Sequence, residues 1–162
     1  MTVNELTMRP ATPEDADKLV AIALNEWRAI YDGFRPQMGE DIFALVYPDP
    51  AADKERQIRH NVASGCCFVT ECEGKIVGFI YYSYDANSHI GTISNNAVSQ
   101  EFRGRGIGPR QYEFIFERLR EMGATVVRVT TGLDEAHAPA RRAYEKAGFV
   151  GNTRSMTYYK KL

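Results

Sequence analysis

A glycine-rich turn between a strand pattern and a helix pattern limits the folds open to this chain. Residues 90–98 can form a strand, and Arg103-Gly104-Arg105-Gly106-Ile107-Gly108 follows. Strand residues return at 125–131, after apolar side chains at helical spacing: Tyr112, Ile115, Phe116, Leu119 and Met122. A strand–helix–strand unit is typical of a crossover between parallel strands. It places the turn at the carboxyl end of a strand, where open sheets bind ligands.

The other segments complete one α/β domain with a mixed sheet, spanning residues 1–162. The predicted order is β-α-α-β-β-β-α-β-α-β. The remaining elements are a strand at 6–9, a helix from the N-cap Thr12 to Asp32-Gly33, a helical region at 39–63 interrupted at 47–50, a hairpin of 66–72 and 75–84, a helix at 135–147 and a last strand at 155–161.

Composition excludes several classes of protein. The formal net charge of the 162 residues is -1, so no basic excess points to nucleic acid or an anionic membrane. The three cysteines, Cys66, Cys67 and Cys72, suit neither a disulfide framework nor a zinc site, and we expect no metal. No segment resembles a signal peptide or a membrane span. These features predict a cytoplasmic protein.

The glycine-rich turn has the chemistry of a pyrophosphate cradle. Glycines let the backbone approach an anion closely, and free N–H groups at a helix start favour phosphate. Arg103 and Arg105 add positive charge. A P-loop is disfavoured because no Gly-Lys-Ser/Thr follows, and a Rossmann fingerprint because the spacing differs. On the turn alone, a flexible surface loop remains an equal alternative.

A second motif follows about thirty residues later, in residues 140–149, Ala-Arg-Arg-Ala-Tyr-Glu-Lys-Ala-Gly-Phe. Small residues line one side of this expected helix, and Gly148 suits its C-cap. Tyr144 is the only large side chain with a polar tip on that face. It is either a functional group or a core aromatic with a satisfied hydroxyl.

Together the two motifs resemble the GNAT superfamily of N-acetyltransferases. Val98-x-x-x-x-Arg103-x-x-Gly106-x-Gly108 is similar to its acetyl-CoA signature, and Ala140-x-x-Ala143-Tyr144-x-x-x-Gly148-Phe149 to its second block. The resemblance implies a splayed mixed sheet and an acyltransferase that uses acetyl-CoA as cosubstrate. It implies direct acetyl transfer from a ternary complex to a primary amine.

The resemblance also implies roles for individual residues. The backbone of Ala97 and Val98 would pair with the pantetheine amides, and Tyr144 would protonate the departing thiolate. His137 stands where the family usually has asparagine, so it either contacts the cofactor or is a solvated residue at a helix start. Pro109 is a second departure, since it removes one N–H close to the phosphates. The pyrophosphate would be held by Arg103, Gly104, Arg105, Gly106, Ile107 and Gly108.

The general base is not apparent. Many relatives carry a glutamate on the strand before the turn, whereas this chain has Ser94-Asn95-Asn96 there. Asn95 could position a water that relays the proton, or the polar stretch could mark a bulge. More remote candidates are Glu26, Asp32, Tyr82 and Tyr84.

Two further expectations concern the acceptor and the alternatives. The acceptor is an amine of unknown class, on a small molecule or a protein, and the enzyme is a monomer or homodimer.

The alternative function is a non-catalytic acyl-CoA-binding or sensing domain; a nucleotide-phosphate-binding module is disfavoured. Aromatic side chains that could line the acceptor pocket, or merely pack, are Tyr31, Phe34, Tyr82, Tyr158 and Tyr159.

Overall fold

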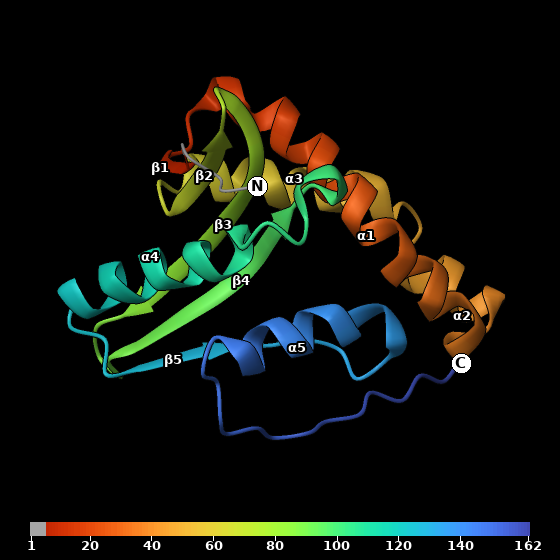
Figure 1. The fold of residues 1–162 in the computed structure, drawn as a ribbon. Helices are drawn as coiled ribbons and strands as arrows, with labels where there is room; N and C mark the ends of the chain where they lie inside the picture. The colour runs from red at the N-terminus through yellow and green to blue at the C-terminus, as the bar shows by residue number, and fades with distance from the viewer. Residues whose placement is uncertain (1–5) are drawn as a thin grey trace.

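The computed structural model describes residues 6–162 and contains a mixed five-stranded sheet in the order β1-β2-β3-β4-β5 (Figure 1). Neighbouring strands from β1 to β4 are antiparallel, and β4 and β5 are parallel. This arrangement confirms the predicted α/β fold and the crossover between the last two strands. The strands are β1 (Leu6–Pro10), β2 (Cys67–Cys72), β3 (Lys75–Asp85), β4 (Ile90–Val98) and β5 (Val126–Val129).

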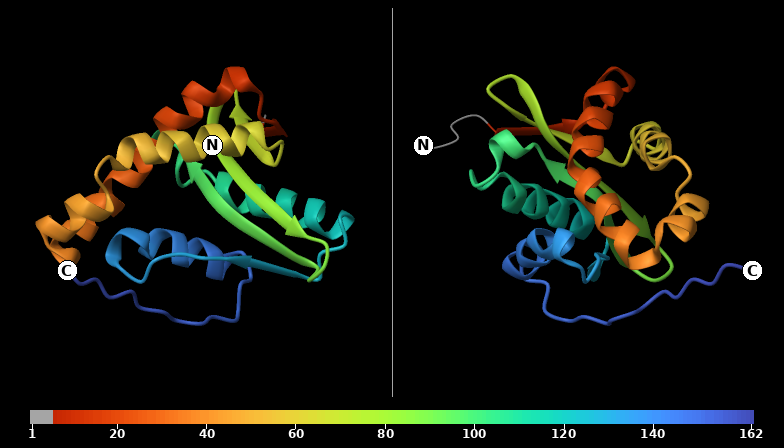
Figure 2. Two further views of the ribbon diagram at one scale, coloured as in Figure 1. Left: turned by 180° about the vertical axis from the view of Figure 1, so that it is seen from behind. Right: turned by 90° about the vertical axis from the view of Figure 1, so that its right-hand side faces the viewer.

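Helices cover both faces of the sheet (Figure 2). Helices α1 and α3 pack on one face, and α4 packs on the other together with α5. Their bounds are α1 (Ala16–Met38), α2 (Glu40–Val46), α3 (Pro50–Ala63), α4 (Ile107–Glu121) and α5 (Ala138–Lys146), with short 3-10 turns at 13–15, 100–102 and 135–137. In residues 6–162 no helix is both long and apolar enough to cross a membrane.

The predicted hairpin carries the centre of the core. Along β2 and β3 successive side chains point to opposite faces. Val69 and Phe79 pack against α1 and α3, whereas Phe68 and Ile80 pack against the α4 side. All four are at most 6% exposed, which explains why this segment has no polar alternation.

Helix α1 is longer than the sequence predicts. We expected Asp32-Gly33 to end it, but the helix continues through Gly33 and Pro36 to Met38. Pro36 removes only one backbone hydrogen bond near the helix end, and aromatic packing offsets this loss. Phe34 stacks on Tyr47, which follows α2, with ring centroids 5.8 Å apart. Gly39, with a φ of 81°, ends the helix instead.

The expected last strand at 155–161 is wrong. Residues 149–162 have no regular structure, and the tail runs along the outer side of α5 toward α2 (Figure 1). Strand propensity needs a neighbouring strand and a face to bury. Neither is present here, since Met156 is 75% and Tyr158 84% exposed. Strand β5 is also shorter than the predicted 125–131.

Strands β4 and β5 part halfway along β4. Their pairing covers Ile90 to Ile93 of β4 and ends at Val129 of β5, while β4 continues beside β3 to Val98. The β3–β4 register also shifts here: Tyr82 pairs with Ile93 and Ile80 with Asn96. A bulge in the polar stretch is therefore confirmed, and beyond it one edge of β4 is open.

We predict that Phe79→Ala and Tyr158→Ala differ sharply in stability. Phe79 is fully buried, so its truncation should lower the free energy of unfolding by about 3–5 kcal/mol. Tyr158→Ala should change it by no more than about 0.5 kcal/mol, because the side chain is exposed. Urea unfolding of both variants checks this. A large loss in Tyr158→Ala would mean that the tail packs as a strand after all.

Candidate active site

A cleft of about 730 Å³ opens where β4 and β5 part. The bulged half of β4 forms its floor, α1 forms one wall, and the segment before α5 forms the other. The residues that matter below are Glu26 and Trp27 of α1, Asn95 and Asn96 of β4, His137, and Tyr144 of α5.

The glycine-rich turn lies directly after this half of β4. Gly104 and Gly106 have φ values of 75° and 76°, which residues other than glycine rarely adopt. Gly106 is the N-cap of the 15-residue helix α4, and among the described residues no side chain caps it. A Cβ atom placed at Gly104, Gly106 or Gly108 would meet no neighbouring atom. The turn is therefore an open surface with free N–H groups at a helix start, and it fits an anion such as a pyrophosphate.

The other residues of the turn differ in what they can offer. Ile107 is 2% exposed and packs with Cys72 and Val77, so only its backbone can face a ligand. Arg105 lies over the Phe102 ring, 4.9 Å from its centroid, and stays at the surface. Gly108 adds a second backbone N–H, whereas Pro109 has none.

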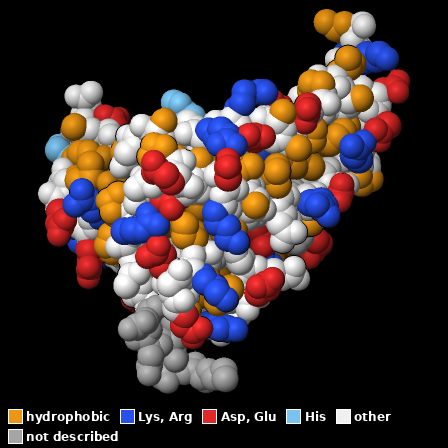
Figure 3. All heavy atoms as spheres, turned by 90° about the horizontal axis from the view of Figure 1, so that it is seen from above, with side chains coloured by type: hydrophobic (Ala, Val, Ile, Leu, Met, Phe, Trp, Pro, Cys, Tyr) orange, Lys and Arg blue, Asp and Glu red, His pale blue; other side chains and the backbone are white. Residues whose placement is uncertain are grey.

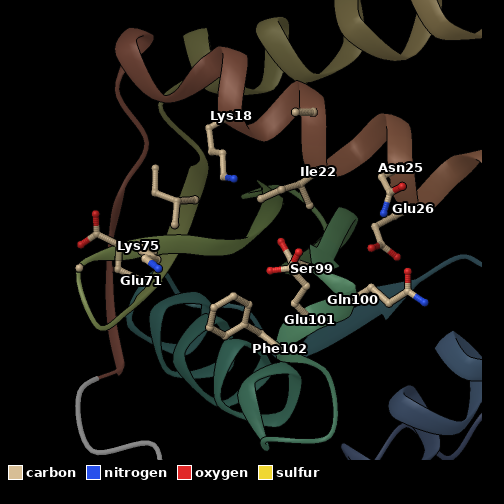
Figure 4. Close-up of a pocket in the computed structure, with 13 residues that line it drawn as sticks. Lys18, Ile22, Asn25, Glu26, Glu71, Lys75, Ser99, Gln100, Glu101 and Phe102 are labelled. Atoms are coloured by element: carbon tan, nitrogen blue, oxygen red, sulfur yellow. The ribbon is translucent and has the colours of Figure 1, made fainter.

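Arg103 points away from the turn. Its guanidinium forms an ion pair with Glu26 of α1, and its Nε donates to the Val98 carbonyl at 3.4 Å. The Glu26 side chain is only 9% exposed, and its Oε1 has no hydrogen-bond partner in residues 6–162. Glu26 also borders a second hollow of about 840 Å³, next to the N-terminal half of α1, where Figure 4 shows its carboxylate directed toward the chain segment after β4.

Tyr144 belongs to a buried network on the α4 side of β4. Its hydroxyl accepts a hydrogen bond from Asn96 Nδ2 at 3.2 Å, and Tyr112 donates to Asn96 Oδ1 at 3.1 Å. Because Tyr144 accepts from Asn96, its own proton remains available to a ligand in the cleft. Burial raises the pKa of Tyr144, so the phenol is protonated at neutral pH. Tyr112 was visible in the sequence only as part of a helical stripe.

Asn95 faces the opposite side of β4. Its Oδ1 accepts from Lys54 Nζ at 3.1 Å, and Lys54 also donates to Gln57 Oε1 at 2.7 Å. The Lys54 ammonium lies 4.3 Å from the Trp27 ring centroid and is 5% exposed as a residue. Burial lowers its pKa to about 8. No pattern in the sequence distinguishes this lysine, which lies in a largely polar helix.

His137 is held at the rim of the cleft. Its Nδ1 lies 2.7 Å from Asp134 Oδ2, and its ring faces that of Phe34 at a centroid distance of 6.3 Å. With 17% of the side chain exposed, it is not a freely solvated residue. Of the other aromatics proposed for an acceptor pocket, Tyr82 lies in the core and Tyr158 is exposed.

In Figure 3, basic and acidic side chains are interspersed on the face shown. Residues 6–162 contain no group of three His, Cys, Asp or Glu side chains placed to hold a metal ion.

Comparisons with known proteins identify the family. The sequence model of the acetyltransferase (GNAT) family matches residues 27–149. The chain belongs to this family. Residues 27–149 of this GNAT chain include the glycine-rich turn, Tyr144 and the cleft lining apart from Asn25 and Glu26. A search of curated proteins found no match.

Solved structures share the fold of this GNAT chain at low sequence identity. The PaiA N-acetyltransferase of Thermoplasma acidophilum, in complex with coenzyme A, has a TM-score of 0.70 and 16% identity over 93% of each chain. The acetyltransferase AAC(6')-Iy, in complex with a bisubstrate analogue, has a TM-score of 0.66 and 15% identity over 98% of this chain and 100% of that one. An aminoglycoside acetyltransferase from an uncultured soil metagenomic sample, in complex with sisomicin, has a TM-score of 0.61 and 19% identity over 98% and 97%.

We predict that Lys54→Met stabilises this GNAT domain at pH 7 and that the gain disappears by about pH 10. The unfolded chain binds a proton at Lys54 up to its ordinary pKa, whereas the folded chain releases it above about 8. Wild-type stability therefore rises with pH across this window, and the variant lacks that rise. At pH 7 the gain should be on the order of 1–3 kcal/mol.

Urea unfolding at pH 7, 8.5 and 10 measures this difference. The matched control is Lys18→Met, at an exposed position on α1, and it should alter the pH dependence little. A gain for Lys54→Met that stays constant across the series would contradict the burial of an ammonium at this position.

Proposed function

We propose that this protein transfers an acetyl group from acetyl-CoA to a primary amine. One observation carries the proposal: an uncapped glycine turn at a helix start follows closely after β4, and a buried, protonated tyrosine lines the cleft beside the same strand, together with Arg103 of the turn. The first fits the pyrophosphate of coenzyme A, and the second fits its sulfur. The family supports acyl transfer, and PaiA supports coenzyme A as the carrier.

The chain offers a continuous path for the cofactor. The N–H groups at the start of α4, beginning with Ile107 and Gly108, would bind the pyrophosphate. The open edge of β4 around Ala97 and Val98 would pair with the pantetheine amides as an added strand would. This path ends beside Tyr144, which contacts Asn96 of β4 and lines the cleft. Acetyl-CoA supplies the activated acetyl group when bound.

Tyr144 has the properties of a proton donor to a thiolate. Its pKa is raised by burial, its hydroxyl is held by Asn96, and its proton is not used within the network. A neutral donor keeps its proton until the C–S bond breaks, when the developing thiolate becomes the stronger base. The Asn96 amide can then stabilise the phenolate that remains.

The acceptor is an amine of a small molecule or a protein. The cleft lining includes two carboxylates, Glu26 and Glu135, which favour a cationic amine over an anionic one. The relatives that bind aminoglycoside-type ligands make polyamino compounds the first class to test.

The alternative is a non-catalytic acyl-CoA-binding domain. It is favoured by one observation, the polar bulge without a carboxylate on β4. Release of coenzyme A from acetyl-CoA across a panel of aminoglycosides, polyamines, amino acids and peptides separates the two. Tight binding of acetyl-CoA without amine-dependent release across this panel would favour the alternative.

We predict that coenzyme A raises the melting temperature of the wild type and not that of Gly106→Glu. A ligand that binds only the folded state stabilises it by mass action. The substitution puts a negative charge at a helix start and strains a residue whose φ is 76°. The control is Gly65→Glu, which has the same strain at a φ of 74° but lies at the end of α3. An equal shift in all three proteins would place the phosphate site elsewhere.

We predict that Tyr144→Phe lowers turnover by on the order of 10². Water can partly replace the lost acid, so the lower end of the usual range applies. The matched control, Tyr112→Phe, removes a hydroxyl of the same network that does not line the cleft. Each variant should lose about 0.5–1.5 kcal/mol of stability. Turnover and unfolding are measured on one preparation. Full turnover in Tyr144→Phe would show that Tyr144 is not the proton donor to the thiolate.

A further inference from the structure

Glu26 and Arg103 form an ion pair that links the cofactor turn to the cleft. We propose that Glu26 is the base that removes the proton from the acceptor amine, and that Arg103 holds it in a resting pair until the cofactor pyrophosphate attracts Arg103 away. This inference rests on the proposed function, because it assigns the base of that same reaction.

Glu26 is the buried carboxylate of the cleft. Of the two carboxylates in the lining, Glu135 is exposed, whereas the Glu26 side chain is 9% exposed. Its Oε1 has no hydrogen-bond partner within residues 6–162, although a buried carboxylate oxygen ordinarily has one. Oε1 is itself buried while the ion pair is intact. Once Arg103 leaves, the carboxylate can turn this oxygen toward a bound ammonium and receive a proton without breaking another hydrogen bond.

Arg103 occupies the other oxygen of Glu26. While the guanidinium is paired, it stabilises the charged carboxylate and makes it a weaker proton acceptor. Arg103 precedes Gly104, so it belongs to the same turn that fits the pyrophosphate. Its side chain is 54% exposed and leaves the pair without disturbing the core. A pyrophosphate offers more negative charge than one carboxylate, so cofactor binding should draw Arg103 toward the turn.

The proton balance of the reaction is complete with these residues. The acceptor ammonium gives one N–H proton to Glu26, and the neutral nitrogen attacks the thioester carbonyl. The new C–N bond forms as the C–S bond breaks, and Tyr144 protonates the thiolate. The second proton that leaves the nitrogen restores Tyr144 through water, and Glu26 releases its proton to solvent. The products are the amide, coenzyme A and one proton.

Cofactor affinity gives the first test, using coenzyme A and isothermal titration. Glu26→Gln frees Arg103, so it should bind coenzyme A about two- to fivefold more tightly, the range expected for a partly exposed ion pair. In an Arg103→Ala background the same substitution should have no effect on affinity. Glu101→Gln, an exposed acid two residues before Arg103, controls for the loss of negative charge. An equal gain in affinity for Glu101→Gln, or a gain for Glu26→Gln that persists in the Arg103→Ala background, would show that the ion pair does not control cofactor binding.

Turnover with two small amines gives the second test. Ethylamine is protonated at neutral pH and needs a base, whereas hydroxylamine is already neutral. Glu26→Gln should slow transfer to ethylamine by on the order of 10² or more and transfer to hydroxylamine much less, after subtraction of the reaction without protein. It should also remove the acidic limb of the rate–pH profile. An equal loss for both amines would exclude Glu26 as the base.

The two tests separate this inference from the proposed function. A wild type that binds coenzyme A but transfers acetyl neither to these two amines nor to any amine of the panel above would exclude both the proposed enzyme and its base. The coenzyme A titration would still decide whether Arg103 exchanges between Glu26 and the pyrophosphate.

Discussion

The early end of the β4–β5 pairing is the constraint on which the site depends. Four residues of β4, from Ile90 to Ile93, pair with β5, and the remainder of the strand keeps one edge open. Unpaired backbone groups in a sheet interior are costly, so the gap suits a ligand that supplies amides of its own. Tyr144 and Arg103 line the cleft at this opening, and the glycine turn follows β4 in the chain.

The bulge in β4 then divides the polar side chains between the two faces of the sheet. Asn95 turns to the α3 side and meets Lys54, whereas Asn96 turns to the α4 side and joins Tyr112 and Tyr144. In a regular strand consecutive residues also alternate, but the extra residue changes which of them faces each helix layer. The bulge thus assigns one asparagine to the phenol and the other to the buried ammonium.

Much of this fold could be predicted from the sequence because its signals are local. The hairpin turn, the helical stripe of α4 and the glycine turn each depend on neighbouring residues. The elements that were predicted wrongly depend on residues distant in the chain. Helix α1 continues past Gly33 and Pro36 because Phe34 packs on Tyr47, and the expected last strand has no neighbouring strand to pair with. Strand identity depends on such tertiary context more than on residue type.

The site shows the same limit. The motifs indicated the turn and Tyr144, but not Tyr112 or Lys54, since a buried tyrosine and a buried lysine look like any core aromatic and any surface charge. The sequence also placed Arg103 with the pyrophosphate, whereas in the structure its guanidinium is held by Glu26. An ion pair between residues 77 positions apart leaves no mark in a single sequence, because each partner is an ordinary charged residue on its own element.

Two polar groups, Glu26 in the cleft wall and Lys54 directly behind it, lower the stability of the folded chain. Among the described residues, the buried Lys54 ammonium forms no ion pair with a carboxylate. The buried Glu26 Oε1 accepts no hydrogen bond there. Each is costly where water is excluded. The core on either side is mostly apolar, with Leu19, Phe79 and Ile115 completely buried, and its buried Gln111 donates a hydrogen bond to Thr70. Among the described residues, one more buried side-chain atom lacks a hydrogen-bond partner, Asn61 Nδ2 of α3, away from the cleft lining. The conflicts at Lys54 and Glu26 are of the kind expected where a protein binds and reacts.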